Sequence, residues 1–206
     1  MRCKGIVIDD FVNYKYPSMF LSVGTCDFKC ARDGNFDKSV CQNSSLAQAE
    51  EIEYDNEKLI DWFISNPITK AVVIGGMEPL TRIDEVVEFI SDFRAKSQAD
   101  IVIYTGYYPY EILEDIRLLA GFGNIIFKFG RYIPDREKRL DPVLGVELSS
   151  DNQYGAVLND ENAQMIIDAL QDTEGYCPCV LIVDDSVLCA CESYRTTGEC
   201  HCGLWK

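Results

Sequence analysis

Residues 71–96 have the sequence AVVIGGMEPLTRIDEVVEFISDFRAK, and this stretch decides the fold. Ala71–Gly75 is a short apolar run that predicts a buried strand. A Gly-Gly-Met-Glu-Pro turn follows it. Arg82–Lys96 then repeats its apolar side chains at helical spacing, which predicts an amphipathic helix. A strand that passes through a tight turn into such a helix is the unit from which parallel α/β sheets are built.

The same alternation continues in both directions along the chain. It predicts strands at Gly5–Ile8, Met19–Val23, Ile101–Thr105 and Asn124–Lys128, and helices at Asn56–Ser65, from Pro109 to Gly121, and from about Asp160 to Leu170. Alternating strands and helices predict an α/β fold with a mostly parallel sheet. Such sheets place their chemistry at the carboxyl ends of the strands.

The charge balance bears on the class of partner. The 206 residues carry a formal net charge of −15, with Lys+Arg 19 against Asp+Glu 34. Nucleic-acid binding needs cationic side chains to displace counterions, so this balance argues against a nucleic-acid partner. The basic run Arg131–Arg139 is interpreted as a solvated loop with a few cations.

The sequence also indicates the cellular compartment of the protein. Residues 1–10, MRCKGIVIDD, have no signal-peptide apolar region, and no apolar run approaches the roughly 20 residues that span a bilayer. We therefore expect a cytoplasmic protein without a membrane partner. Structural disulfides are rare in that compartment, which disfavours the alternative of a secreted disulfide framework.

Ten cysteines therefore need another explanation, and they fall into two groups. After Cys3 come Cys26, Cys30 and Cys41, and after a long gap come Cys177, Cys179, Cys189, Cys191, Cys200 and Cys202. Two separate groups in a reducing compartment indicate two metal sites.

The first group directly follows the predicted strand Met19–Val23. Three thiolates on one loop can hold three irons of a [4Fe–4S] cluster and leave the fourth iron open to an exchangeable ligand. The alternative is zinc bound by three cysteines and another ligand, but the only histidine, His201, belongs to the other group. In Gly75–Pro79, the glycines allow the backbone to approach a ligand closely, and Glu78 can accept a hydrogen bond from an ammonium group.

With these motifs, residues 1–155 resemble the radical S-adenosylmethionine (SAM) superfamily, and most closely the activating proteins of anaerobic (class III) ribonucleoside-triphosphate reductase. The motifs that carry the resemblance are Cys26, Cys30, Cys41-Gln-Asn, Gly75–Pro79, Tyr104–Tyr107, Lys128–Arg131 and Ser149–Gln153. The resemblance implies a partial (β/α) barrel.

The resemblance also implies a reaction and its partners. SAM would be cleaved reductively at a [4Fe–4S] cluster, and the resulting 5′-deoxyadenosyl radical would take a hydrogen atom from a glycine of the reductase. Metal ligands would be Cys26, Cys30 and Cys41. SAM-binding residues would be Gly75, Gly76, Glu78, Tyr104, Lys128, Ser149 and Asn152.

One departure from the family lies between the second and third cysteines, where Ala31–Val40 lengthens the usual gap and Val40 stands where an aromatic residue is common. Because loop-closure entropy grows slowly with length, the longer loop costs only about 1 kcal/mol. We therefore expect the cluster to tolerate it, although the adenine contact near that aromatic residue becomes less certain.

The second group fills the last thirty residues, which are too few to build a core alone and so need a metal or a staple. Four thiolates suffice for a cluster, and two left over can cycle as a disulfide that the adjacent His201 can protonate. The alternative is a structural zinc site with two spare cysteines.

Residues 160–206 resemble the catalytic subunit of ferredoxin:thioredoxin reductase. The resemblance implies that Cys177, Cys189, Cys191 and Cys200 bind a second [4Fe–4S] cluster, that Cys179 and Cys202 form a redox-active disulfide, and that His201 donates protons. Ferredoxin or flavodoxin would supply the electrons.

The sequence thus predicts a radical SAM domain at residues 1–155 and a small Cys-rich helical domain at residues 156–206. The leading hypothesis for function is a glycyl-radical activase whose tail transfers electrons or thiols. The alternatives are a ferredoxin-dependent disulfide reductase and a noncatalytic metal-binding protein.

Overall fold

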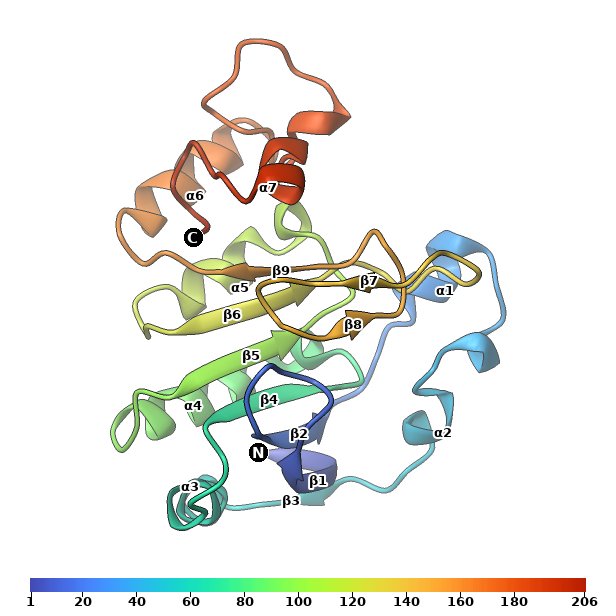
Figure 1. The fold of residues 1–206 in the computed structure, drawn as a ribbon, viewed down its shortest axis with the longest axis vertical. Coiled ribbons are helices and arrows are strands. Elements are labelled where there is room, and N and C mark those ends of the chain that lie inside the picture. The colour runs from blue at the N-terminus through green and yellow to red at the C-terminus, as the bar shows by residue number, and fades with distance from the viewer.

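A single mixed sheet runs through the computed structural model, which describes residues 1–206 (Figure 1). Its seven strands lie in the order β3 (Ile52–Glu53), β1 (Arg2–Asp10), β2 (Ser18–Val23), β4 (Ala71–Gly76), β5 (Asp100–Tyr104), β6 (Ile125–Phe129) and β9 (Tyr154–Val157). The four central strands from β2 to β6 are parallel. The predicted α/β class with a mostly parallel sheet is therefore confirmed.

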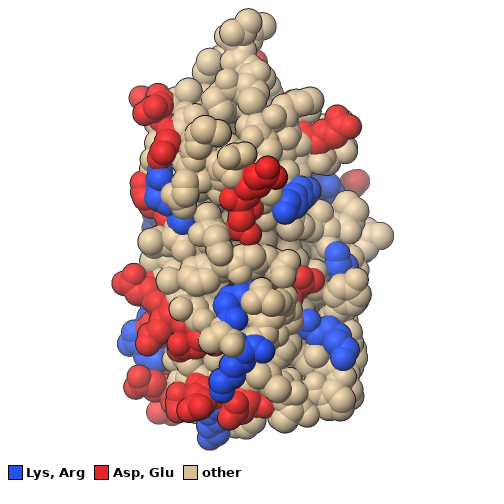
Figure 2. Space-filling model, turned by 90° about the vertical axis from the view of Figure 1, so that its left-hand side faces the viewer, with Lys and Arg blue, Asp and Glu red and all other residues tan.

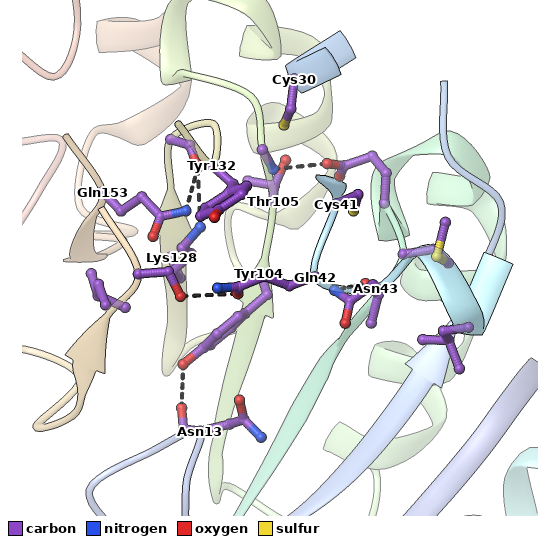
Figure 3. Close-up of a pocket in the computed structure, with 18 of the residues that line it drawn as sticks. Asn13, Cys30, Cys41, Gln42, Asn43, Tyr104, Thr105, Lys128, Tyr132 and Gln153 are labelled. Carbon is purple, nitrogen blue, oxygen red and sulfur yellow. Dashed lines mark hydrogen bonds between the residues drawn. The ribbon is translucent and has the colours of Figure 1, made fainter. Parts of the chain in front are cut away.

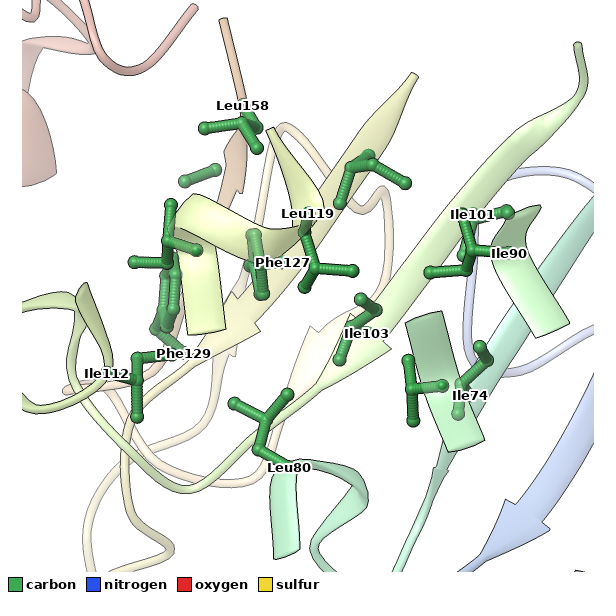
Figure 4. Packing of buried hydrophobic residues seen from close by; sticks show 14 of the residues in the cluster. Ile74, Leu80, Ile90, Ile101, Ile103, Ile112, Leu119, Phe127, Phe129 and Leu158 are labelled. Carbon is green, nitrogen blue, oxygen red and sulfur yellow. The ribbon is translucent and has the colours of Figure 1, made fainter. Parts of the chain in front are cut away.

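Helices cover one face of the sheet. These helices are α3 (Asn56–Ser65), α4 (Ile83–Arg94), α5 (Leu113–Leu119) and, beside α5, α6 (Ala163–Asp172), and the first three lie behind the sheet in Figure 1. Side chains alternate along a strand, so every second residue meets the helices. Ile74, Ile103 and Phe127 do so and are fully buried against residues such as Ile90 and Leu119 (Figure 4).

The opposite face of the sheet has a thinner cover. A smaller apolar cluster there contains Val73, Val102, Ile126, Leu144 and Leu148. The last two belong to the segment that forms the hairpin of β7 (Arg139–Leu140) and β8 (Glu147–Leu148), which lies in front of the sheet in Figure 1. Toward the carboxyl ends of the strands this apolar cover gives way to polar side chains, which leaves room for a site.

The helix expected from Pro109 begins differently from the prediction. Pro109–Glu111 forms a 3₁₀ helix, η3, and the chain turns at Ile112 before α5 begins. A second 3₁₀ helix, η2 (Pro79–Arg82), likewise precedes α4. The helix expected from about Asp160 begins at Ala163, after Asn162 adopts a positive φ of 61°.

The segment between β2 and α3 leaves the sheet at its carboxyl edge. It contains α1 (Lys29–Gly34), the 3₁₀ helix η1 (Lys38–Val40) and α2 (Ser44–Ala47). In Figure 1 these elements lie on the side toward which the arrowheads of β4, β5 and β6 point. The extra residues between Cys30 and Cys41 therefore form ordered structure at the sheet edge where a site was expected.

The tail contains η4 (Asp185–Val187) and α7 (Glu192–Thr197), and its end returns to the sheet. Trp205 is buried in the main core and forms a bridge with Leu158 directly after β9. The boundary expected near residue 155 thus falls within β9, and the residues beyond it share the core of the sheet. The two-domain division stays a prediction.

Two surface properties complete the description. On the face that Figure 2 presents, Asp and Glu side chains are interspersed with Lys and Arg, and no extended basic surface appears there. None of the helices combines the length and the apolar character that crossing a membrane requires.

Candidate functional site

A cavity of about 300 Å³ opens at the carboxyl ends of the parallel strands. Its lining comes from four separate parts of the chain: the β1–β2 loop, the cysteine segment, the ends of β4 to β6, and the β8–β9 region (Figure 3). Most of the residues expected to form the site line it, namely Cys26, Cys30, Cys41, Gly76, Glu78, Tyr104, Lys128 and Ser149.

The three cysteines approach the cavity from one segment. Phe28 adopts a positive φ of 54°, which turns the chain sharply between Cys26 and Cys30. The Phe28 N–H donates to the Cys26 sulfur at 3.2 Å. Burial raises the pKa of Cys26 to about 12 and also raises the pKa of Cys30. These thiols therefore need a metal or a cation to become thiolates at neutral pH.

The three cysteine sulfurs are the kind of donor set that iron–sulfur clusters use. No three Cys, His, Asp or Glu side chains lie close enough together to hold one metal ion. A four-iron cluster is larger than an ion and keeps its cysteine sulfurs farther apart. Soft thiolates are the ligands that such clusters prefer, and backbone N–H donors to the sulfurs stabilise them.

The Gly-Gly turn shapes the floor of the cavity. Gly76 has a φ of +89°, and a Cβ atom on it would lie 2.9 Å from Leu46 and 3.1 Å from the Ser22 Cα. The Asn43 side-chain amide donates to the Gly76 carbonyl at 2.5 Å. Gly75 does not line the cavity, but it leaves space for the Tyr104 side chain on the next strand. Both positions therefore require glycine for steric reasons.

Glu78 is buried at the end of β4 and connects two loops. Its carboxylate accepts from the Gly106 N–H at 2.8 Å, from the Leu80 N–H at 3.3 Å and from the Thr105 hydroxyl. Burial raises the pKa of Glu78 to about 7, because the charged carboxylate loses water. A cationic ligand group in the cavity would favour the charged form.

Lys128 supplies the positive charge of the cavity. Its Nζ donates to the Gly130 carbonyl at 3.0 Å and lies 6.0 Å from the centre of the Tyr104 ring. Burial lowers the pKa of Lys128 to about 8, and the nearby Cys30 and Glu78 partly offset that effect. The lysine is placed to stabilise negative charge on Cys30.

The residues after β8 divide between the cavity and the protein interior. Ser149 Oγ donates to Gln42 Oε1 at 3.0 Å, which joins two walls of the cavity. Asn152 does not line the cavity; its amide donates to the Arg131 carbonyl at 2.8 Å and to the Tyr108 hydroxyl at 3.1 Å. The adjacent Gln153 lines the cavity instead.

The sequence analysis missed several lining residues, among them Asn13 and Tyr132. Asn13 and Tyr132 both contribute to the cavity, and the Asn13 carbonyl accepts from the Tyr104 hydroxyl at 2.5 Å. Neither belongs to a motif. The available signal was position alone, since Asn13 lies in the loop before β2 and Tyr132 lies just after β6.

The tail cysteines differ in burial. Cys177 and Cys189 are buried, Cys179 is exposed, and all ten cysteines are free thiols. The Trp205 indole N–H donates to the Cys189 sulfur at 3.4 Å.

The last cysteine pair lies close together. The Cys200 and Cys202 sulfurs are 3.4 Å apart, and hydrogen bonding from Cys202 is the main cause that lowers the pKa of Cys200. The exposed His201 lines a cavity of about 350 Å³ together with Cys177 and Cys191.

The comparison with protein families bears on the first cysteine group. The model of a family described as a 4Fe-4S single cluster domain matches residues 17–141, a range that contains Cys26, Cys30 and Cys41. No curated protein and no solved structure matches the chain. The family match and the cavity that gathers the three cysteines agree, and the chain belongs to the 4Fe-4S single cluster domain family.

Proposed function

We propose that this chain is a radical SAM activating protein that installs a glycyl radical on a partner enzyme. One observation carries the proposal: a single cavity gathers three cysteines, the turn Gly76–Glu78 and a buried lysine at the carboxyl ends of parallel strands. In this proposal the central strands and their helices form the partial barrel of that family.

Cys26, Cys30 and Cys41 would hold the [4Fe–4S] cluster, which supplies the electron that cleaves SAM to methionine and a 5′-deoxyadenosyl radical. The Phe28 N–H and Lys128 stabilise the thiolates and lower the net negative charge of the site. The cavity walls exclude water from the reacting groups.

The Gly76–Glu78 turn would bind the amino-acid end of SAM. Gly76 leaves the backbone open to the ligand, and Glu78 offers a carboxylate to an ammonium group. Because that carboxylate already accepts two backbone N–H groups, its position is fixed before SAM binds. We assign Tyr104 and Ser149 to the cavity walls that would surround the nucleoside of SAM. Gly75 and Asn152 would support these walls from outside the cavity.

Anaerobic ribonucleotide reductase is the partner that the ordered motifs favour, with ferredoxin or flavodoxin as electron donor. Thiolate-bound clusters need a reducing compartment, so the proposal places the chain in the cytoplasm.

The tail would carry a second [4Fe–4S] cluster on Cys177, Cys189, Cys191 and Cys200. Cys177, Cys191 and Cys200 all lie close enough to Cys189 for their charges to affect its pKa. Cys179 and Cys202 would form the disulfide, with His201 as proton donor. The exposure of Cys179 suits attack on the disulfide of another protein.

That exposed thiol favours a second candidate function. A thiol at the surface beside a group of buried cysteines is what a ferredoxin-dependent disulfide reductase requires. In that case the first site would serve in docking or electron transfer and would not cleave SAM.

Anaerobic reconstitution with iron, sulfide, a reductant and SAM separates the two functions. The activase should release 5′-deoxyadenosine and hold about eight irons per chain, as two four-iron clusters require. Replacing Cys26, Cys30 and Cys41 by Ala should abolish 5′-deoxyadenosine and remove about half of the iron. Cys3→Ala is the control, because Cys3 lies in β1 outside both groups. An intact first cluster without SAM cleavage would contradict the proposal and favour the reductase.

A further inference from the structure

The turn between β5 and α5 contacts the first cysteine segment through Glu111. The Glu111 carboxylate accepts from Lys29 Nζ at 2.5 Å, from an Arg131 guanidinium nitrogen at 2.5 Å and from the Tyr108 N–H at 2.9 Å. Arg131 also forms an ion pair with Asp33 at 2.8 Å. The side chains of Glu111 and Arg131 are only 13% and 10% exposed, so water screens this pair little.

These ion pairs provide the main attachment of α1. Ala31 is the only buried residue of this helix, so apolar packing holds it weakly. Lys29 and Asp33 belong to α1 and flank Cys30. On the other side of the network, Arg131 directly precedes Tyr132, which lines the same cavity as Cys30. Glu111 therefore joins the segment that contains Cys30 to the segment that follows β6.

The same turn reaches the tail cysteines at its other side. The stacked rings of Tyr108 and Tyr110 are 5.8 Å apart and line a cavity of about 300 Å³ together with Cys189. Tyr110 packs so closely on Gly175 that a Cβ atom there would lie 2.6 Å from the Tyr110 Cβ. The Gly175 carbonyl in turn accepts from the Cys189 N–H at 3.0 Å.

We propose that the turn Tyr108–Glu111 links the two cysteine groups mechanically. Glu111 is a positioning residue for Cys30, and Tyr110 is a positioning residue for Cys189. A change that loosens one group is transmitted through this rigid turn to the other, because the two contacts share one short segment. The inference rests on the placement of the cysteines and does not require SAM cleavage.

Thiol alkylation of the reduced, metal-free protein tests this link. The rate of iodoacetamide labelling at each cysteine, read by mass spectrometry, reports how often the segment around that cysteine opens. Glu111→Gln should speed labelling of Cys30 about tenfold, because charge-assisted hydrogen bonds are lost. Glu111→Asp should restore part of the slow rate. Glu85→Gln is the matched control for labelling of Cys30 and Cys189, since Glu85 binds Arg2 and Arg82 away from these two cysteines.

The proposal is decided by the effect of each substitution on the cysteine of the other group, because coupling between two sites is reciprocal. Glu111→Gln should also speed labelling of Cys189, and Tyr110→Ala should speed labelling of Cys30, each by about three- to tenfold. Cys3, which is 1% exposed in the core, reports opening of the whole fold and should keep its rate. Effects confined to the cysteine nearest each substitution would overturn the link, and so would equal acceleration at Cys3. An absence of 5′-deoxyadenosine in the separate SAM assay would leave this result unaffected.

Discussion

Replacing Glu78 by Gln should remove a specific pH dependence from the stability of the metal-free protein. Glu78 is 5% exposed, and burial raises its pKa from 4.5 to about 7. The fold therefore prefers the protonated carboxyl. Glutamine keeps the size and one acceptor oxygen but cannot ionise, so it isolates the effect of the charge.

The magnitude follows from the two pKa values. The interval from 4.5 to about 7 corresponds to about 3 kcal/mol in the free energy of unfolding. Since the folded pKa is the higher one, this stabilisation is fully present below pH 4.5 and is lost as the pH rises through about 7. Lys128 interacts electrostatically with Glu78, and burial lowers the pKa of Lys128 from 10.5 to about 8, so the comparison ends at pH 7, below the titration of the lysine.

Anaerobic urea unfolding of the metal-free protein between pH 4.5 and 7 measures the effect. The wild-type unfolding free energy should fall by about 3 kcal/mol more than that of Glu78→Gln across this range. Asp115, whose pKa burial raises to about 6, contributes equally to both proteins and cancels in the difference. Parallel profiles would refute the reasoning, because Glu78 would then not be desolvated as its burial indicates.

Three further outcomes follow from the site and the tail. Glu78→Gln should weaken SAM binding about ten- to hundredfold by calorimetry while leaving the iron content unchanged, since a charge-assisted hydrogen bond is lost. Gly76→Ala should cost at least about 2 kcal/mol more stability than Gly121→Ala, because both have a positive φ but only Gly76 has neighbours within 4 Å. Trp205→Phe should lower the unfolding free energy by about 1–3 kcal/mol through the lost N–H donor to Cys189 and a small cavity, as measured in urea.

The central part of the fold could be predicted because its strands and helices have strong periodicity. Ala71–Gly76 and Asn56–Ser65 match their predicted ranges within one residue. Strand direction could not be predicted at the edges: β1 and β9 are antiparallel to their neighbours, and an apolar run looks the same in either direction. β9 also lacked a signal, since its four residues, YGAV, include a glycine.

The candidate site could be predicted where residue type carries the chemistry. Residue chemistry alone indicates the thiol of Cys26 and the glycine Gly76, whereas Lys128 is predicted only through the family resemblance. The family match supports the cluster, while the SAM-binding roles stay predictions. Asn152 and Gln153 show the limit, because adjacent residues in a turn point in different directions and only coordinates reveal that Gln153 lines the cavity.

Packing and metal binding would stabilise different parts of the tail. The sequence alone suggests that the last thirty residues depend on metal, yet Leu204 and Trp205 are buried in the core of the sheet, and the Asn159 N–H donates to the Leu204 carbonyl at 2.9 Å. Packing on the sheet therefore anchors that end of the tail.

The segment between the first two tail pairs is different. Val180–Val183 consists of exposed apolar residues, with Leu181 fully exposed. The side chains of residues 181–183 lie mostly in solvent, so a ligand held by the neighbouring cysteines would restrict the segment from both ends. Metal binding would then order Cys177–Cys191 while the anchored end remains in place, and chelation should expose only that segment to protease. If chelation also released Trp205 from the core, as seen in its fluorescence, the packing of the tail would depend on the metal as well.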